Sequence, residues 1–230
     1  MTWVKICGIT NLEDALVAVD AGADAVGFVF YEKSPRFVPV EKAREIVEQL
    51  PKTIEKVGVF AGDSIEHAVE IGSYARFDAL QVYLLTYRKP AEERELATRA
   101  MGSGLKMYLA LPMSVFLGEG SRNIAGFATE RPAGVLDTLF LDSGGSERPG
   151  GTGEKFDWQE SASTVRELSL HQKVVIAGGL HPANVSDAIE LLRPWGVDVA
   201  SGVEARPGRK DPDKVRDFVR AARATNWRTS

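Results

Sequence analysis

The first apolar run of the chain, Val4-Lys5-Ile6-Cys7, ends in its only cysteine. Side chains of a β-strand alternate between two faces, so Lys5 and Cys7 should share one face while Val4 and Ile6 share the other. An adjacent cation lowers the pKa of a thiol and makes the thiolate available as a base or nucleophile. A lone free cysteine is more often a small buried hydrophobe, so Cys7 taken alone favours a structural role, and the residues that follow in the chain must decide.

Two further charged side chains follow predicted strands. Alternation along residues 138–142 puts Phe140 and Asp142 on one face, so the Asp142 carboxyl can serve as an acid or a base at the end of that strand. Arg36 lies in the loop after the run at 25–30. Asp24 and Asp78 precede their strands, and we assign these two to capping and turns.

Glycines follow the last two predicted strands, in the dipeptides Gly178-Gly179 and Ser201-Gly202. Glycine lets backbone N–H groups approach an anion closely, and a short helix that begins there adds its dipole. In a parallel barrel the loops after strands seven and eight are the recurrent phosphate position. We therefore predict phosphate binding by Gly178, Gly179, Ser201 and Gly202, with plain turn geometry as the alternative.

The elements that must position these groups alternate from end to end. Strand patterns recur eight times, at 4–6, 25–30, 56–60, 79–83, 105–109, 138–141, 174–177 and 197–200. Helix patterns lie in most of the gaps, with N-caps expected at Asn11 and Ser64. Further helices are expected over 39–50, 90–101, 182–192 and 211–223 and in the segment after Asp157. Between 112 and 134 we expect a broken helix. The glycine-rich stretch 144–155 is either a lid that closes over the site or a surface loop with no role in function.

Eight strand–helix units in 230 residues fit one fold class. They predict a single eight-stranded parallel α/β barrel, a (β/α)8 TIM barrel, that forms one domain over residues 1–230. An open doubly wound sheet is disfavoured because no G-x-G-x-x-G motif follows the first strand. Functional groups should then gather at the carboxyl ends of the strands.

Composition and charge exclude several classes of binding partner. The net charge is −4, which argues against nucleic acid as the main partner. One cysteine excludes an internal disulfide, and no apolar run approaches membrane-spanning length, so we expect a soluble cytoplasmic protein without a membrane partner. The three histidines are far apart in sequence, so a metal site is not expected.

Several of these segments together resemble the phosphoribosylanthranilate isomerase family. The order and spacing of the matching segments agree from residue 4 to about residue 220; they are 4–10, 22–30, 33–36, 141–143, 150–153, 156–158, 178–180, 182, 184–185, 198–199 and 201–204. The opening motif combined with Gly150-Gly151-Thr152-Gly153 and Phe156-Asp157-Trp158 is specific, because other phosphate-binding barrels do not usually carry both.

The resemblance implies an Amadori rearrangement of N-(5-phosphoribosyl)anthranilate to 1-(2-carboxyphenylamino)-1-deoxyribulose 5-phosphate. Cys7 would be the general base, Asp142 the general acid and Arg36 the partner of the anthranilate carboxylate. Further substrate contacts are expected from Lys5, Gln81, Tyr83 and Asp198. The reaction needs no cofactor and no metal, and the partner would be a small phosphorylated aminosugar. Whether the chain is a monomer or a homodimer stays open.

The chain departs from the family at its fourth strand. The family usually carries Gln-Leu-His-Gly there, whereas this chain has Gln81-Val82-Tyr83-Leu84, and the segment 83–136 matches poorly. Two alternatives therefore stay open. One is a related isomerase of a histidine-pathway aminosugar phosphate, or an enzyme with both substrates, although that family generally has aspartate at the position of Cys7. The other is a non-enzymatic barrel that binds a sugar phosphate.

Overall fold

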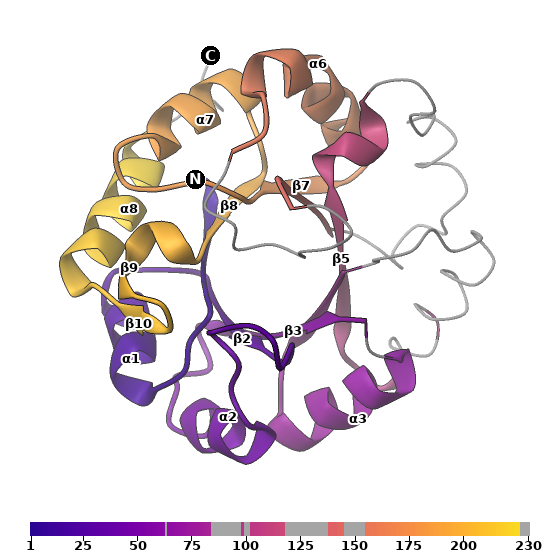
Figure 1. Cartoon of the computed structure of the whole chain (residues 1–230), viewed down its shortest axis with the longest axis vertical. Coiled ribbons are helices and arrows are strands. Elements are labelled where there is room, and N and C mark those ends of the chain that lie inside the picture. The colour runs from indigo at the N-terminus through magenta and orange to yellow at the C-terminus, as the bar shows by residue number, and fades with distance from the viewer. Residues whose placement is uncertain (63, 84–97, 99–101, 118–137, 145–154, 226–230) are drawn as a thin grey trace.

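Eight parallel strands close into a barrel in the order β1 to β8, and helices surround it (Figure 1). In this computed structural model the strands are β1 (Trp3–Cys7), β2 (Ala25–Val29), β3 (Glu55–Ala61), β4 (Ala79–Tyr83), β5 (Lys106–Pro112), β6 (Thr138–Asp142), β7 (Lys173–Ile176) and β8 (Gly196–Val199). The predicted TIM barrel and all eight predicted strands are confirmed. The prediction of one domain over residues 1–230 stays a prediction.

The structure describes residues 1–62, 64–83, 98, 102–117, 138–144 and 155–225. The predicted helix over 90–101 falls almost wholly outside the described residues, as do most of 112–134 and of the 144–155 loop. The part of the 112–134 segment that is described contains a short 3-10 helix, η1 (Met113–Phe116). Within the described ranges, no helix is both long and apolar enough to cross a bilayer.

Four of the described helices begin directly after a residue whose side chain caps them. The described helices are α1 (Leu12–Asp20), α2 (Val40–Val47), α3 (Ile65–Ala75), α6 (Trp158–Ser169), α7 (Val185–Leu192) and α8 (Pro212–Ala224). The side chains of Asn11, Ser64, Asp157 and Asp211 each accept a hydrogen bond from a first-turn amide. The last helix starts with Pro212, a residue suited to the first helical position.

One predicted helix begins later than its pattern indicates. We expect a helix from residue 182, but α7 starts at Val185. The Asn184 side chain accepts a hydrogen bond from the His181 amide and donates one to the Gly179 carbonyl, so residues 181–184 form a turn that is held by Asn184. This turn connects the end of β7 to α7 and shapes the loop that carries Gly178 and Gly179.

Alternation along the strands separates two apolar regions. Val4, Ile6, Leu139 and Leu141 face outward into the large core between the strands and the helices. Inside the barrel, a smaller cluster includes Ala25, Val57, Ala79, Tyr108, Ala110, Phe140 and Val175. The carboxylates of Asp24 and Asp78 accept hydrogen bonds from the Val4 and Lys56 amides at the amino-terminal ends of strands, which confirms their structural assignment.

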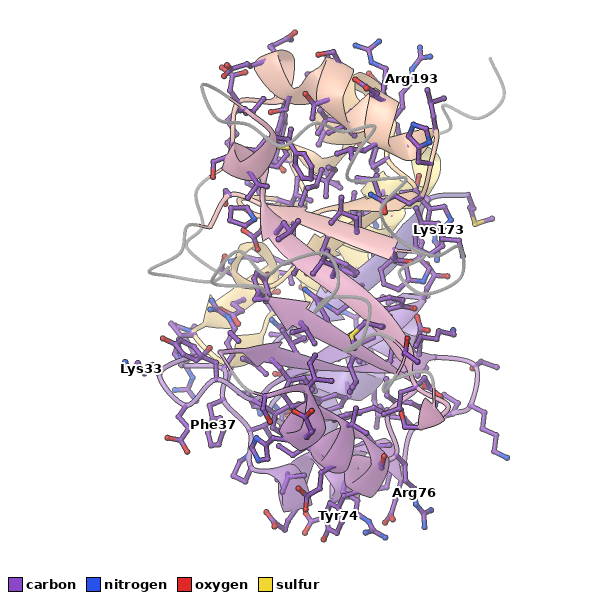
Figure 2. All side chains as sticks on the ribbon, turned by 90° about the vertical axis from the view of Figure 1, so that its right-hand side faces the viewer. Lys33, Phe37, Tyr74, Arg76, Lys173 and Arg193 are labelled. Atoms are coloured by element: carbon purple, nitrogen blue, oxygen red, sulfur yellow. The ribbon has the colours of Figure 1, made fainter. Side chains whose placement is uncertain are left out.

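The two ends of the barrel carry different loops. Viewed from the side, Lys33 and Phe37 of the β2–α2 loop lie at one end, and Lys173 at the start of β7 lies at the other (Figure 2). The end with Lys33 is the carboxyl end of the strands, which we call the mouth. A two-stranded hairpin, β9 (Glu204–Arg206) and β10 (Arg209–Lys210), follows β8 at the mouth.

Candidate active site

A pocket at the mouth brings together most of the predicted site residues. Those that line it are Cys7, Arg36, Tyr83, Asp142, Gly178, Gly179, Asp198 and Ser201. They come from β1, β4, β6 and β8 and from the segments that follow β2, β7 and β8. Closure of the barrel therefore brings distant residues to one cavity; Cys7 and Ser201, for example, are 194 positions apart in the sequence.

Three predicted site residues do not line this pocket. Lys5 and Gln81 are fully buried inside the barrel, and Gly202 packs against the turn after β7, where a Cβ would come within 1.9 Å of the Leu180 carbonyl oxygen. Both polar atoms of the Gln81 amide are buried without a hydrogen-bond partner among the described residues. Direct substrate contacts of Lys5 and Gln81 stay predictions.

Cys7 lies in a buried group of charges. The Lys5 ammonium is 2.9 Å from Asp198 Oδ1, and both the thiol and the ammonium pack against Gly27 of β2. A Cβ at residue 27 would lie 2.9 Å from Cys7 Sγ and 3.1 Å from Lys5 Nζ, so only glycine leaves room for the pair. Breaking a buried ion pair leaves one charge without compensation, which holds Lys5 and Asp198 in place.

The net direction of the thiol pKa corrects one expectation from the sequence. Burial raises the pKa of Cys7, and the attraction of Lys5 opposes this without reversing it. For Lys5 itself, burial lowers the pKa, but the charges and hydrogen bonds of Asp198 and Cys7 turn the net direction upward. The ammonium therefore stays charged beside the thiol, and the thiolate forms at a higher pH than for an ordinary cysteine.

This arrangement predicts the pH at which Cys7 reacts. Because burial disfavours the thiolate, the rate of alkylation by iodoacetamide should rise with pH through a midpoint above the ordinary thiol pKa. Lys5→Met should move that midpoint higher still, because the cation is lost. Mass spectrometry reports on one site, since the chain has a single cysteine.

Lys106→Met is the matched control, because it removes an ammonium that pairs with Glu55 at the amino-terminal end of the strands. It should leave the midpoint unchanged. Lys5→Met together with Asp198→Asn removes both members of the buried pair, in case the single variant is unstable. A midpoint below the ordinary value in the native protein, or one that Lys5→Met leaves unchanged, would contradict the assignment.

Asp142 is held by donors on both of its oxygens. Oδ1 accepts hydrogen bonds from the Gly144 amide at 2.9 Å and from Ser143 Oγ at 3.3 Å. Oδ2 accepts one from the Tyr83 hydroxyl at 2.8 Å. Burial raises the pKa of Tyr83 strongly, and the Asp142 charge adds to this, so the phenol stays a donor. The carboxyl group is thus fixed in orientation at the mouth.

Arg36 reaches the pocket over the end of β1. Its aliphatic stem crosses Gly8, where a Cβ would lie 2.6 Å from Arg36 Cδ, and Gly8 has a positive φ of 78° that favours glycine. Its Nε and Nη2 donate to the two carboxylate oxygens of Glu204, each at 2.8 Å. Another hydrogen of Nη2 and the Nη1 group form the second edge of the guanidinium, which can meet a second carboxylate.

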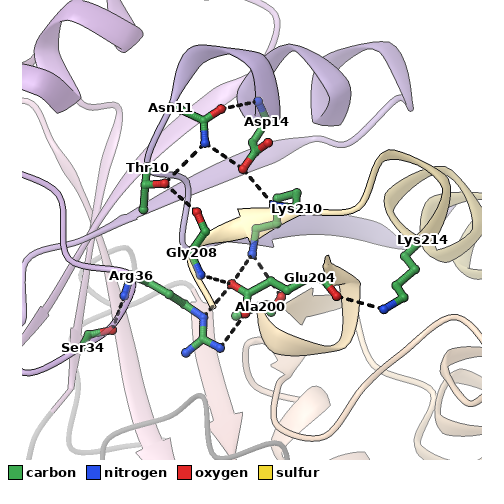
Figure 3. Close-up of polar contacts among 10 residues, drawn as sticks. All are labelled: Thr10, Asn11, Asp14, Ser34, Arg36, Ala200, Glu204, Gly208, Lys210 and Lys214. Atoms are coloured by element: carbon green, nitrogen blue, oxygen red, sulfur yellow. Dashed lines mark hydrogen bonds and ion pairs between the residues drawn. The ribbon is translucent and has the colours of Figure 1, made fainter. Parts of the chain in front are cut away.

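Sequence reasoning did not identify Glu204, which binds Arg36 in this candidate site. Lys210 donates to Glu204 Oε1 at 3.1 Å and to the Ala200 carbonyl at 3.0 Å, and Lys214 binds the Glu204 carbonyl oxygen at 2.9 Å (Figure 3). Burial alone raises the pKa of Glu204, but its hydrogen bonds to Arg36 and the charge of Lys210 lower it overall. The hairpin after β8 therefore fixes Arg36. An acidic residue just after the last strand was the available signal.

The hairpin is tied to the start of the chain as well. Thr10 Oγ1 donates to the Gly208 carbonyl at 2.7 Å, and the Lys210 amide donates to Asp14 Oδ2 at 2.8 Å (Figure 3). These contacts join the first and last strand–helix units around Arg36.

The loop after β7 and the segment after β8 form the other side of the pocket. Gly178 and Gly179 have φ of 85° and 63°, and a Cβ at residue 178 would lie 2.2 Å from Ser143 Oγ. Glycine is therefore required at residue 178 by conformation and by packing. After β8 a 3-10 turn, η2 (Ser201–Val203), begins at the pocket wall. Backbone amides at both places can approach an anion.

A buried thiol, a fixed carboxyl and a guanidinium at the mouth of a closed parallel barrel define an α/β-barrel enzyme that moves protons on an anionic substrate. Residues 4–221 match the family model described as N-(5'phosphoribosyl)anthranilate (PRA) isomerase. The chain belongs to the N-(5'-phosphoribosyl)anthranilate isomerase family.

Relatives and solved structures agree with this assignment. The N-(5'-phosphoribosyl)anthranilate isomerase of Citrifermentans bemidjiense is 39% identical over 223 residues, which cover 97% of this chain and 98% of that one. The crystal structure of phosphoribosyl anthranilate isomerase from Thermotoga maritima superposes with a TM-score of 0.78 at 38% identity, and the match covers 97% of this chain and all of that one. A further structure, with a TM-score of 0.76 at 35% identity and coverage of 97% and 100%, is a complex with reduced 1-(o-carboxyphenylamino)-1-deoxyribulose 5-phosphate.

Proposed function

We propose that this chain converts N-(5'-phosphoribosyl)anthranilate to 1-(2-carboxyphenylamino)-1-deoxyribulose 5-phosphate in tryptophan biosynthesis. The observation that carries the proposal is the placement of Cys7, Asp142 and Arg36 on one pocket of a chain that belongs to this family. A structural relative binds a reduced form of the same product, so a ligand with a carboxylate and a phosphate fits this kind of pocket.

The residues divide the chemistry between an acid and a base. Asp142 gives a proton to the ring oxygen of the ribose as the bond from C1 to that oxygen breaks, and an open-chain iminium forms. The positive iminium acidifies the C2–H bond, and the Cys7 thiolate takes that proton to give an enolamine. Tautomerisation of the enolamine places a proton on C1 and leaves the C2 ketone. Solvent returns Cys7 and Asp142 to their starting states.

Lys5 supports the base. Removal of the C2 proton needs the thiolate, whose formation is opposed by burial and favoured by the Lys5 ammonium. Asp198 in turn keeps Lys5 charged and oriented through the 2.9 Å ion pair. We infer that Lys5 and Asp198 serve as positioning residues beneath the reacting atoms.

The substrate is held at both ends. The second edge of the Arg36 guanidinium can accept the anthranilate carboxylate in a bidentate pair while Glu204 keeps the first edge. The phosphate would bind to backbone amides at Gly178, Gly179 and Ser201. Binding energy from both ends holds C2 near Cys7.

The test generates the labile substrate in situ from anthranilate and phosphoribosyl pyrophosphate with the preceding transferase. Addition of this protein should remove the fluorescence of the substrate at a rate proportional to the protein concentration. Denatured protein is the control. Fluorescence that persists in the presence of folded protein would exclude the proposed activity.

Arg36→Met tests whether the carboxylate end and the phosphate end of the substrate are bound by different residues. It should raise KM about 10-fold to 100-fold, because hydrogen bonds to charged groups contribute about 1.5–3 kcal/mol. Inhibition by inorganic phosphate should be nearly unchanged. Gly202→Val should instead weaken inhibition by inorganic phosphate, because its side chain would displace the Leu180 carbonyl and with it the turn that carries Gly178 and Gly179. Steady-state kinetics with and without phosphate measure both effects.

Arg44→Met is the control for charge, since Arg44 pairs with Glu48 on the exposed face of α2. It should change neither KM nor phosphate inhibition. If Arg36→Met and Gly202→Val weaken phosphate inhibition equally, the two ends of the site are not separate.

Assembly and location are parts of the same proposal. A structural relative is described as monomers generated from the dimeric enzyme of Thermotoga maritima. We infer that this chain is a monomer or a homodimer and acts in the cytoplasm, and light scattering at several concentrations distinguishes the two assemblies.

A further inference from the structure

We propose that Tyr83 is a positioning residue that acts through Asp142: its hydroxyl fixes the carboxyl group and stabilises the carboxylate that remains after Oδ2 has delivered its proton. This inference rests on the proposed function, in which Asp142 is the acid. It assigns Tyr83 a role different from the substrate contact that the sequence predicts.

Strand geometry allows the contact. Tyr83 ends β4, and β5 lies between β4 and β6 in the barrel. The residue of β5 in register with Tyr83 is Ala110, an inward-facing residue with only a methyl side chain. The phenol ring therefore passes this position and places its hydroxyl 2.8 Å from Asp142 Oδ2 on β6.

The hydrogen bonds of Asp142 distinguish its two oxygens. A carboxylate oxygen has two lone pairs, and those of Oδ1 meet the Gly144 amide and Ser143 Oγ. Oδ2 accepts from Tyr83 alone among the described residues, which leaves one lone pair. The transferable proton is therefore carried by Oδ2, on the side of the Tyr83 hydroxyl.

The same hydrogen bond supports the transfer. When Oδ2 gives up its proton to the ring oxygen, the carboxylate becomes charged and its bond to the Tyr83 hydroxyl becomes charge-assisted. Such bonds are about twice as strong as neutral ones. The phenol thus stabilises the state that follows proton delivery, and it neither gains nor loses a proton itself.

The first experiment compares Tyr83→Phe with Tyr108→Phe in the fluorescence assay. Tyr108 is the matched control, because its hydroxyl donates to Glu55 at 2.7 Å, so the same change removes a phenol–carboxylate bond far from the mouth. Tyr83→Phe should lower kcat about tenfold or more and change KM less than threefold. Tyr108→Phe should leave kcat unchanged. A raised KM with an unchanged kcat would instead make Tyr83 a substrate contact and overturn the proposal.

A double-mutant cycle tests whether the effect passes through Asp142. In an Asp142→Asn background, Tyr83→Phe should cause no further loss of kcat, because the acid on which it acts is already absent. Losses that multiply would show that Tyr83 acts independently of Asp142, and the proposal would fail.

A spectroscopic measurement keeps the test independent of turnover. In protein labelled with ¹³Cζ-tyrosine, the Tyr83 signal is identified by its loss in Tyr83→Phe. Asp142→Asn should lower the pKa of Tyr83, because the carboxylate charge contributes to its raised value. An unchanged titration would overturn the Tyr83–Asp142 pair. If the pair titrates as expected while the native protein does not turn over the substrate, the proposed function fails and the contact stands.

Discussion

Cys7→Ala should lower kcat by about 100-fold or more, which is the scale of general acid–base contributions. Cys7 is the only thiol in the chain, it lines the pocket, and the Lys5 ammonium beside it favours the thiolate. The variant leaves Lys5 and Asp198 in place, so the ion pair that supports the floor of the site is retained. KM should change little, because the contacts proposed for the two ends of the substrate involve other residues.

The measurement is kcat in the coupled fluorescence assay, with thermal unfolding to verify the fold. Cys7→Ser is the control for size, and it should be as impaired as Cys7→Ala because a hydroxyl is a poor base at neutral pH. Substrate that carries deuterium at C2 should react more slowly in the native enzyme if the proton transfer limits the rate. Near-normal turnover of Cys7→Ala would remove Cys7 from the mechanism.

Asp142→Asn should lower kcat by a similar factor, about 100-fold or more. Asparagine keeps the shape of the side chain and can still accept a hydrogen bond, but an amide cannot deliver a proton to the ring oxygen. The asparagine Oδ1 can still accept from the Gly144 amide, and the Tyr83 hydroxyl can rotate to accept from Nδ2, so the loss should be one of chemistry and not of folding. The effect should appear in kcat, with a smaller change in KM.

Asp157→Asn provides the matched control. Its carboxylate accepts a hydrogen bond from the Glu160 amide as the N-cap of α6, a role in which asparagine serves equally well. This variant should keep native turnover and stability. Native-like kcat in Asp142→Asn would mean that the ring opens without this acid, and the assignment of Asp142 would be withdrawn.

Local rules were enough to predict the strands, most of the helices and much of the pocket from the sequence. Alternation along a strand put Lys5 with Cys7 and Phe140 with Asp142, because the period of two does not depend on distant residues. The caps at Asn11 and Ser64 involve contacts three residues away, so they too could be predicted from the sequence. The rule that barrel sites lie at strand carboxyl ends then placed Cys7, Asp142 and Gly178 on one pocket.

The partners of these residues were a matter of tertiary structure. The Arg36–Glu204 pair joins residues 168 positions apart, and the Tyr83–Asp142 bond joins residues 59 apart. No periodicity specifies which side chains meet across a closed barrel, because the meeting depends on strand stagger and on small residues such as Gly8 and Ala110 that leave room.

The pKa of the Cys7 thiol shows most clearly what the sequence determines and what only the tertiary structure decides. The sequence determined that a cation lies beside Cys7, and from that neighbour alone a lowered pKa was expected. The fold decided the net direction, because burial of the whole group opposes the thiolate more strongly than Lys5 favours it. Desolvation is set by everything that excludes water around a group, and only the closed barrel determines that quantity.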